Sequence, residues 1–191
     1  QNVTEIDPCR VCSDERRDND ELVATWGNLV NRVLTFAYRN FDCKVPTPGD
    51  LTEDDQALIA AAERAIGETG SQIAACNFRA GLEAAMSAAR DANRYIEDNA
   101  PWKLIKEDRE RCATVLWTAL TAISGLKTAL SPFLPFTCQT LHEYLGNTGS
   151  VGDSGWLLLR PQPGAGLAEA QPLFKKLDPE IIEAEDAKLG V

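Results

Sequence analysis

The sequence contains a single histidine, His142, and lacks the residue clusters on which enzyme chemistry usually depends. A Ser-His-Asp or Cys-His arrangement would have to use this histidine, yet it lies in a helical stretch, and no glycine-rich nucleophile turn occurs in the chain. No phosphate-cradling glycine motif precedes a Lys-Ser or Lys-Thr pair. The carboxylates are abundant but scattered over helix surfaces. We therefore expect no catalytic residues in this chain.

Basic residues are also few, because 19 Lys and Arg stand against 29 Asp and Glu, which gives a net charge of −10. Proteins that bind nucleic acid without sequence preference use basic surfaces and gain affinity from counterion release. This composition argues against that class. If the chain binds RNA, binding must depend on a small site with directed contacts and a local basic patch. The alternative is that the acidity serves only solubility.

A metal centre would lack most of its ligands. Cys9 and Cys12 form the one CxxC pair among the six cysteines, and no second pair accompanies it. A structural zinc site normally has four Cys or His ligands in two close pairs. We expect no metal site, with a zinc or redox role for the CxxC pair as the alternative. The cysteines in helical patterns are expected to act as small hydrophobes: Cys76, Cys112 and Cys138.

Long apolar runs and a secretory signal are missing too. No run approaches the roughly 20 apolar residues that span a bilayer, and the chain does not open with a basic segment followed by an apolar one. The hydrophobic fraction of 44% and the charged fraction of 25% are ordinary for a globular protein. We expect a cytoplasmic protein with no membrane partner.

The sequence does have helical periodicity over most of its length. A first helix is expected from Asp18 to residues 41–51, where two prolines and a glycine break the pattern. Thr52, followed by three acids, is a typical start for a second helix, which runs to about residue 73. Further helices are expected at about 77–98, as a short helix from Pro101, at about 109–130, and from there past two prolines to about 145.

These helices and their short connections predict an all-α fold, an antiparallel helix bundle. We divide the chain into an irregular arm at 1–16, the bundle at 17–146, and a tail at 147–191 that is rich in glycine and proline. The tail is expected to pack on the bundle. Within it, residues 156–159 have the pattern of a short strand and residues 178–189 that of a terminal helix.

Two short segments carry side chains that suit recognition of an unpaired base. On the first helix, Trp26 belongs to an apolar stripe that faces the core, and Asn28 and Arg32 lie four residues apart on the polar flank. An amide beside a guanidinium offers the donors and acceptors that read a base edge. Most such pairs on helices are merely solvated, so the pair alone is a weak signal.

The second segment contains Trp102, which stands directly after Pro101 at the start of a short helix. An indole at such a helix end can be exposed and stack on a base, whereas burial in the core is the commoner outcome for an isolated tryptophan. Trp117 lies on an apolar stripe and is expected in the core. The basic cluster of the chain follows Trp102 directly: Lys103, Lys106, Arg109 and Arg111.

The same two segments resemble a known family. Residues 21–32 (ELVATWGNLVNR) and 92–102 (ANRYIEDNAPW) are similar to the opening helix and the second signature of the anticodon-binding domain of methionyl-tRNA synthetases. Residues 130–135 (LSPFLP) and 172–178 (PLFKKLD) resemble the late helix junction and the end of its bacterial members. The resemblance covers about residues 17–191, and the order and spacing of the four motifs make it specific.

The resemblance implies that the chain recognises the CAU anticodon of methionine tRNA. By this resemblance Asn28, Arg32 and Trp102 meet the anticodon, and Pro101 belongs to the same turn. The catalytic domain of these class I ligases has no counterpart in the sequence. ATP and methionine would belong to that domain, so no cofactor is expected in this chain. The chain is a fragment, an excised domain or a free-standing relative of a methionine-tRNA ligase.

Three hypotheses follow for the function. The first is a tRNA-binding module that serves protein biosynthesis, with a class I synthetase catalytic domain as a further partner. The second is a free-standing helical module that has lost tRNA binding and contacts protein through its acidic surface and its tail. The third is an enzyme whose site the sequence does not reveal. Binding to tRNAs that differ only in the anticodon separates the first two.

Overall fold

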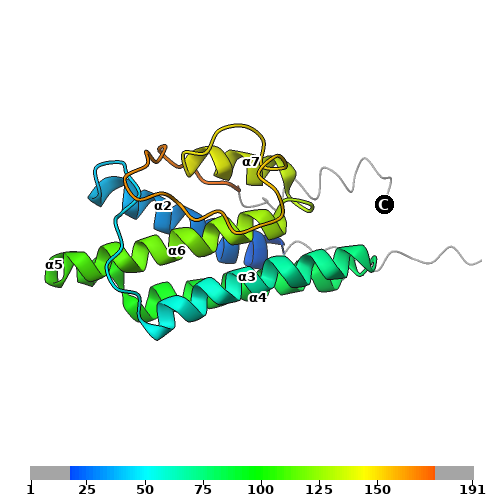
Figure 1. Cartoon of the computed structure of the whole chain (residues 1–191), viewed down its shortest axis with the longest axis horizontal. Coiled ribbons are helices and arrows are strands. Elements are labelled where there is room, and N and C mark those ends of the chain that lie inside the picture. Colours follow the sequence, from blue (N-terminus) through cyan, green and yellow to red (C-terminus); the bar gives the residue numbers. More distant parts are fainter. Residues whose placement is uncertain (1–17, 175–191) are drawn as a thin grey trace, which may run out of the picture.

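The computed structural model describes residues 18–174, which form a bundle of helices followed by an extended segment (Figure 1). The predicted all-α bundle is confirmed. The arm at 1–16 with its Cys9–Cys12 pair and the terminal helix at 178–189 lie outside the described residues. The elements, in order, are the π-helical segment η1 (Asp18–Gly27) and the helices α2 (Asn28–Asn40), α3 (Glu53–Ala74), α4 (Phe78–Asn99), α5 (Pro101–Glu107), α6 (Arg109–Leu130) and α7 (Pro135–Tyr144).

Capping side chains and a proline mark the starts of three helices where the sequence predicted them. The Thr52 hydroxyl accepts a hydrogen bond from the Asp55 N–H, and the Asp55 carboxylate accepts one from the Thr52 N–H, so α3 begins with a capping box. Asp108 caps α6 by accepting from the Arg111 N–H (2.9 Å). Pro101 is the first residue of α5.

The core lies between α3, α4 and α6, the three helices of 22 residues. Half of the buried residues of α4 are alanine, a small side chain that lets neighbouring helices approach closely. α6 is the central helix, and all of its residues from 112 to 130 are buried. Trp26 and Trp117 are buried in this core, as predicted.

α6 is long and apolar enough to cross a membrane by length and composition, although the sequence contains no long run that is purely apolar. Its most apolar window is completely buried by the rest of the bundle. The core helix of a globular protein has the same length and composition. These properties are therefore weak evidence for a membrane span.

Residues 146–174, here called the tail segment, run back across the bundle as irregular chain (yellow to orange in Figure 1). Two indole groups fasten it. Trp117 of α6 donates its Nε1–H to the Pro161 carbonyl (3.0 Å), and Trp156 of the tail segment donates its Nε1–H to the Ile66 carbonyl of α3 (3.0 Å). The bundle therefore holds the tail segment at two separate points.

Two glycines let the tail segment lie close to the helices. A Cβ atom at Gly70 of α3 would stand 2.7 Å from Nε1 of Trp156, and one at Gly125 of α6 would stand 2.7 Å from a methyl group of Leu158. Real Cβ atoms essentially never come that close to another heavy atom. The glycines thus provide the space in which the tail segment packs.

The strand predicted at residues 156–159 is wrong. The described residues contain only one isolated antiparallel bridge, which joins Lys44 to Gly166. Trp156 and Leu158 pack against α3 and α6 instead of a neighbouring strand, and the Leu157 carbonyl accepts a hydrogen bond from the Thr128 hydroxyl of α6 (3.2 Å). A short continuous apolar run suits either environment.

Cys76 is exposed, although it was predicted to act as a small hydrophobe in a helical pattern, and Phe78 is exposed beside it. They lie at the turn between α3 and α4, where residues 74–80 are all exposed because the hairpin end extends past the helices that cover the rest of it. The sequence pattern shows which side of a helix is apolar, but it does not show how much of the helix length the neighbouring helices cover. Cys112 and Cys138 are buried, as predicted.

Candidate nucleic-acid interface

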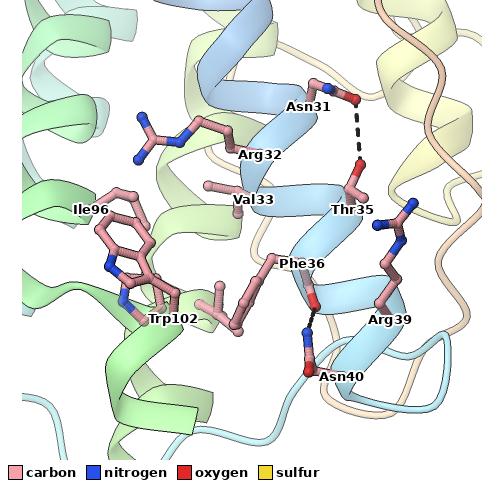
Figure 2. Close-up of a pocket in the computed structure, with 11 residues that line it drawn as sticks. Asn31, Arg32, Val33, Thr35, Phe36, Arg39, Asn40, Ile96 and Trp102 are labelled. Atoms are coloured by element: carbon pink, nitrogen blue, oxygen red, sulfur yellow. Dashed lines mark hydrogen bonds between the residues drawn. The ribbon is translucent and has the colours of Figure 1, made fainter.

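α2 carries a row of side chains beside its buried face. The buried face consists of Leu29, Val30, Val33, Leu34 and Ala37. Arg32 and Phe36 on the adjacent flank are half-buried, and Arg39 is exposed. Residues three and four apart share one side of a helix, so these three side chains follow one another along α2. Arg32 and Phe36 lie on the side of α2 toward the junction of α4 and α5 (Figure 2), and Arg39 lines the same pocket.

The junction of α4 and α5 is a sharp turn at one left-handed residue. Ala100 has φ 41° and ψ 62°, a conformation that costs energy in a residue with a Cβ atom. Its N–H donates to the Ile96 carbonyl (3.0 Å), and its own carbonyl accepts from the Lys103 N–H (2.8 Å). Pro101 follows with the fixed φ that suits a first helical position. Trp102 therefore lies in the first turn of α5.

A pocket of about 300 Å³ lies between α2 and this junction (Figure 2). Phe36 and Trp102 both line it, and the exposed fraction of Trp102 is 42%. The buried wall is apolar and consists of Val33, Ile96, Pro101 and Leu116. The remaining lining residues are polar: Asn31, Arg32, Thr35, Arg39 and Asn40. This volume is at the small end of ligand pockets, and an apolar wall with a polar edge suits one planar ring system.

Arg32 lies over the indole of Trp102, with its guanidinium carbon 5.4 Å from the ring centroid, which is a cation–π distance. Glu97 of α4, largely exposed, has Oε1 3.9 Å from Arg32 Nη1, and such an exposed ion pair contributes little energy. The side chain of Arg32 is 33% exposed, so solvent can reach it. The paired N–H donors of a guanidinium thus lie beside an aromatic ring, and this combination suits the binding of an unpaired base.

The structure brings three of the four predicted site residues together. Arg32, Pro101 and Trp102 line the pocket, and Pro101 is buried, so it forms the turn rather than an exposed surface. Asn28 is exposed at the first position of α2, one turn before Arg32, and does not line the pocket. Contact between these four residues and RNA remains a prediction.

The basic cluster predicted after Trp102 is smaller in the structure. Lys103 and Lys106 are exposed on α5. Arg109 is also exposed, although its guanidinium donates to the Asn40 carbonyl (2.6 Å) and lies over the ring of Phe41. Arg111 does not belong to this surface, because its guanidinium pairs with a buried carboxylate on α3. This carboxylate is far from Arg111 in sequence, so the cluster of basic residues around Arg111 gave no indication of the pair.

Several pocket residues had no functional signal in the sequence. Phe36 follows Val33 of the buried face at the helical spacing of three residues, but it is only half-buried and lines the pocket. The Thr35 hydroxyl donates to Asn31 Oδ1 (3.3 Å), and Asn40 Nδ2 donates to the Phe36 carbonyl (2.9 Å). The one available signal was their spacing of four residues along the same flank as Arg32.

His142 lies in α7 outside the pocket and is buried. Its Nδ1 is 3.1 Å from Lys127 Nζ, and its Nε2 is 3.2 Å from the Thr148 carbonyl. A carbonyl can only accept, so Nε2 carries the proton and Nδ1 accepts from the lysine. Burial lowers the pKa of Lys127 to about 8 and also lowers the pKa of His142. Both ring nitrogens have partners, so this histidine joins α6, α7 and the tail segment rather than serving as a base.

A sequence model of one protein family, described as the anticodon binding domain of methionyl tRNA ligase, matches residues 45–190. The matched residues include Pro101 and Trp102 but not Asn28 or Arg32.

Known proteins match over a larger part of the chain. The methionine-tRNA ligase of Chloroflexus aurantiacus is 42% identical over 91% of this chain, and that of Dehalococcoides mccartyi strain 195 is 46% identical over 92%. These alignments cover 33% and 32% of the two proteins, so the chain spans about a third of their length. The crystal structure of apo Mycobacterium tuberculosis methionyl-tRNA synthetase superposes with a TM-score of 0.80 and 27% identity, over 86% of this chain and 34% of that one.

Proposed function

The chain belongs to the family of anticodon-binding domains of methionyl-tRNA ligases, and on this basis we propose that it binds methionine tRNA through the CAU anticodon. The observation that carries the proposal is the meeting of Arg32 and Trp102 at one open pocket. The two residues come from separate elements and were selected from the sequence for separate reasons. Their convergence supports a common role.

The chemistry of the pocket supports recognition of a base that has left its stack. The ring of Trp102 offers a stacking surface, and base stacking on an aromatic side chain is independent of base identity. The guanidinium of Arg32 supplies paired donors, which distinguish one base edge from another. Asn28 offers an amide on the same helix one turn away. In this proposal Trp102 contributes affinity, and Arg32 with Asn28 contributes selectivity.

The charge around the pocket supports an RNA ligand in spite of the net charge of −10. Arg39 lies at the pocket, and Lys103, Lys106 and Arg109 are exposed on α5 and the start of α6. Phosphates on either side of a splayed base would meet these cations. Affinity should therefore fall with added salt, but less steeply than for a protein that covers a long stretch of backbone.

We infer that the chain acts as part or relative of a methionine-tRNA ligase in cytoplasmic protein biosynthesis. The two ligases named above are about three times as long as the matched segment. In this proposal a separate class I catalytic domain binds ATP and methionine and activates the amino acid. The present chain then contributes affinity for the tRNA and selection of its anticodon.

The test is a titration of the chain with RNA stem-loops that differ only in the anticodon, all at one salt concentration. We expect the CAU loop to bind more tightly than single-base variants by roughly tenfold or more, from about 1–3 kcal/mol per base contact. Equal affinity for all loops would overturn anticodon recognition and leave only phosphate contacts. No binding to any loop would instead favour the protein-interaction module.

A further inference from the structure

The turn that presents Trp102 is held from inside the bundle by a buried carboxylate. Asp55 of α3 has no exposed surface. Its Oδ1 accepts from Arg111 Nη2 (2.8 Å) and from the Tyr95 hydroxyl, and its Oδ2 accepts from Arg111 Nη1 and from the Thr52 N–H (2.9 Å). The network therefore joins α3, α4 and α6 through one side chain.

The network is saturated, which is the condition for a buried charge to be tolerated. Burial alone would raise the pKa of Asp55, but the hydrogen bonds from Arg111, Tyr95 and the Thr52 N–H outweigh it and lower the pKa to about 2. Burial and the neighbouring carboxylate raise the pKa of Tyr95. At neutral pH Asp55 is therefore charged, Tyr95 is protonated, and each hydrogen bond has a defined direction.

The same arginine reaches the turn itself. Arg111 Nη2 donates to Asn99 Oδ1 (3.1 Å), and Asn99 is the last residue of α4. The thiol of Cys112, the next residue of α6, donates to the Pro101 carbonyl (3.4 Å). The first turn of α6 thus contacts the residues on both sides of Ala100. These contacts help offset the cost of its left-handed conformation.

We propose that Arg111 and Asn99 are positioning residues for anticodon recognition, because they fix the turn that presents Trp102 to the pocket without contacting RNA themselves. The inference rests on the proposed function. Trp102 is 42% exposed, so its own packing fixes its direction less firmly than burial would. Its place beside Arg32 depends on where α5 begins. The first residue of α5 is Pro101, whose carbonyl accepts from the Cys112 thiol, and Asn99, two residues earlier, accepts from Arg111.

The decisive variant is Asn99→Ala, because it cuts the connection between Arg111 and the turn and leaves the Asp55–Arg111 pair in place. It also removes the hydrogen bond from Asn99 Nδ2 to the Tyr95 carbonyl within α4 (2.9 Å). Asn77→Ala is the matched control, since Asn77 precedes the opposite end of α4 and its amide also bonds to one side chain, that of Gln72 (3.2 Å). Arg111→Lys is the second variant, because it keeps the charge and loses the fork. Arg90→Lys, at an exposed pair with Glu83, is its control.

The first readout needs no RNA. In the chain labelled with 5-fluorotryptophan, the ¹⁹F resonance of Trp102 is assigned from its loss in Trp102→Phe. We expect Asn99→Ala and Arg111→Lys to shift or broaden this resonance, while the resonances of Trp26 and Trp156 stay in place. Neither control variant should move it. An unchanged Trp102 resonance in folded Asn99→Ala would overturn the proposal, even if Arg111→Lys fails to fold.

The second readout is affinity for the CAU stem-loop. We expect Asn99→Ala to weaken binding by roughly 3- to 30-fold, the range of coupling between residues of one network. The same change made in Trp102→Ala should cost almost nothing further, because the residue being positioned is gone. Equal losses in both backgrounds would mean that Asn99 acts elsewhere and would overturn the proposal. If the unmodified chain fails to prefer the CAU loop, the proposed function fails, and the fluorine resonance still decides whether these residues position Trp102.

Discussion

Trp102 and Trp156 have almost the same exposed fraction, 42% and 43%, but their indoles are held in different ways. Trp156 donates its N–H to the backbone of α3 and lies against Gly70, where no side chain would fit. Trp102 lines an open pocket and has a guanidinium over its ring. The first arrangement anchors a segment of chain, and the second leaves a ring beside space that a ligand can enter. Exposure alone therefore does not separate an anchor from a candidate binding residue, whereas the contacts around the two indoles do.

The regions around the two tryptophans also differ in their buried charges. The region near Trp102 contains Asp55 and Arg111, which have opposite charges and stabilise each other. On the side of the bundle that carries the tail segment, Lys127 and His142 would repel each other if both were charged. The first region should therefore lose stability when a charge is removed, and the second should gain stability when a proton is removed.

The largest effect is expected for Asp55→Ala, which would leave Arg111 partly buried without its partner. We expect a loss of about 3–5 kcal/mol in the free energy of unfolding, measured by urea denaturation at pH 7. The contribution should fade as the pH drops from 3.8 toward 2, because the folded pKa of Asp55 is the lower one. Asp54→Ala, an exposed neighbour in the same turn, should change stability by less than about 0.5 kcal/mol. Equal effects of the two substitutions would contradict the assignment.

Replacing each of the two tryptophans by alanine should affect a different quantity: RNA affinity for Trp102 and folding stability for Trp156. Trp102→Ala should weaken binding to the CAU loop by about 1–3 kcal/mol per stacked base and change stability little. Trp156→Ala should lower stability by about 1–2 kcal/mol, since a hydrogen bond and part of a ring contact are lost, and leave RNA affinity unchanged. Urea unfolding and RNA titration on the same preparations measure both quantities. A stability loss of about 3–5 kcal/mol in Trp102→Ala, with RNA affinity intact, would make Trp102 a core anchor.

Arg32→Lys tests whether the pocket reads a base edge or only a charge. The lysine keeps the positive charge and loses the planar fork. We expect a loss of about 1–3 kcal/mol for the CAU loop and a much smaller loss for loops with other anticodons. Arg94→Lys, an exposed arginine of α4 outside the pocket, is the control. Equal weakening for every anticodon would mean that Arg32 contacts phosphate.

A further effect concerns pH and the buried lysine. The pKa of Lys127 is about 8 in the folded chain and 10.5 when unperturbed, so between these values the unfolded chain binds more protons. Stability should therefore rise with pH in this window, by at most about 1.4 kcal/mol per pH unit. His142 and Cys138 adjoin Lys127, and burial keeps the thiol protonated by raising its pKa to about 12. Lys127→Met should remove the rise relative to the unmodified chain, and the exposed Lys44→Met should not.

Local features of the sequence were enough to predict most helix ends and some residues of the candidate site. Thr52, Pro101 and Asp108 act through their nearest neighbours along the chain, so the starts of three helices agree with the structure. The long helix at 109–130 was predicted with both its ends. Arg32 and Trp102 were each selected from local patterns, and the family resemblance joined them before the structure placed them together.

Other features depend on contacts between distant parts of the chain. Asp55 was predicted as one of several acids in a first helical turn, and its partner Arg111, 56 residues away, as part of a surface cluster. A saturated buried pair cannot be read from either local sequence. Phe36 followed the period of a core residue, but α5 leaves its pocket side open. In each case the missing information was which element covers the residue.

The tail segment also bears on the order in which the chain folds. α3, α4 and α6 are close in sequence, with a short turn and the short helix α5 between them, so they can pack while later residues are still being synthesised. The pairing of Val45 with Ala165 (N–H to carbonyl, 2.8 Å) joins segments that are far apart in sequence, and closing so large a loop costs entropy. We expect the pocket to form before the tail segment docks. A chain that ends near residue 150 would then already contain the pocket, but it would lack the Pro161 carbonyl to which the indole N–H of Trp117 donates in the complete bundle.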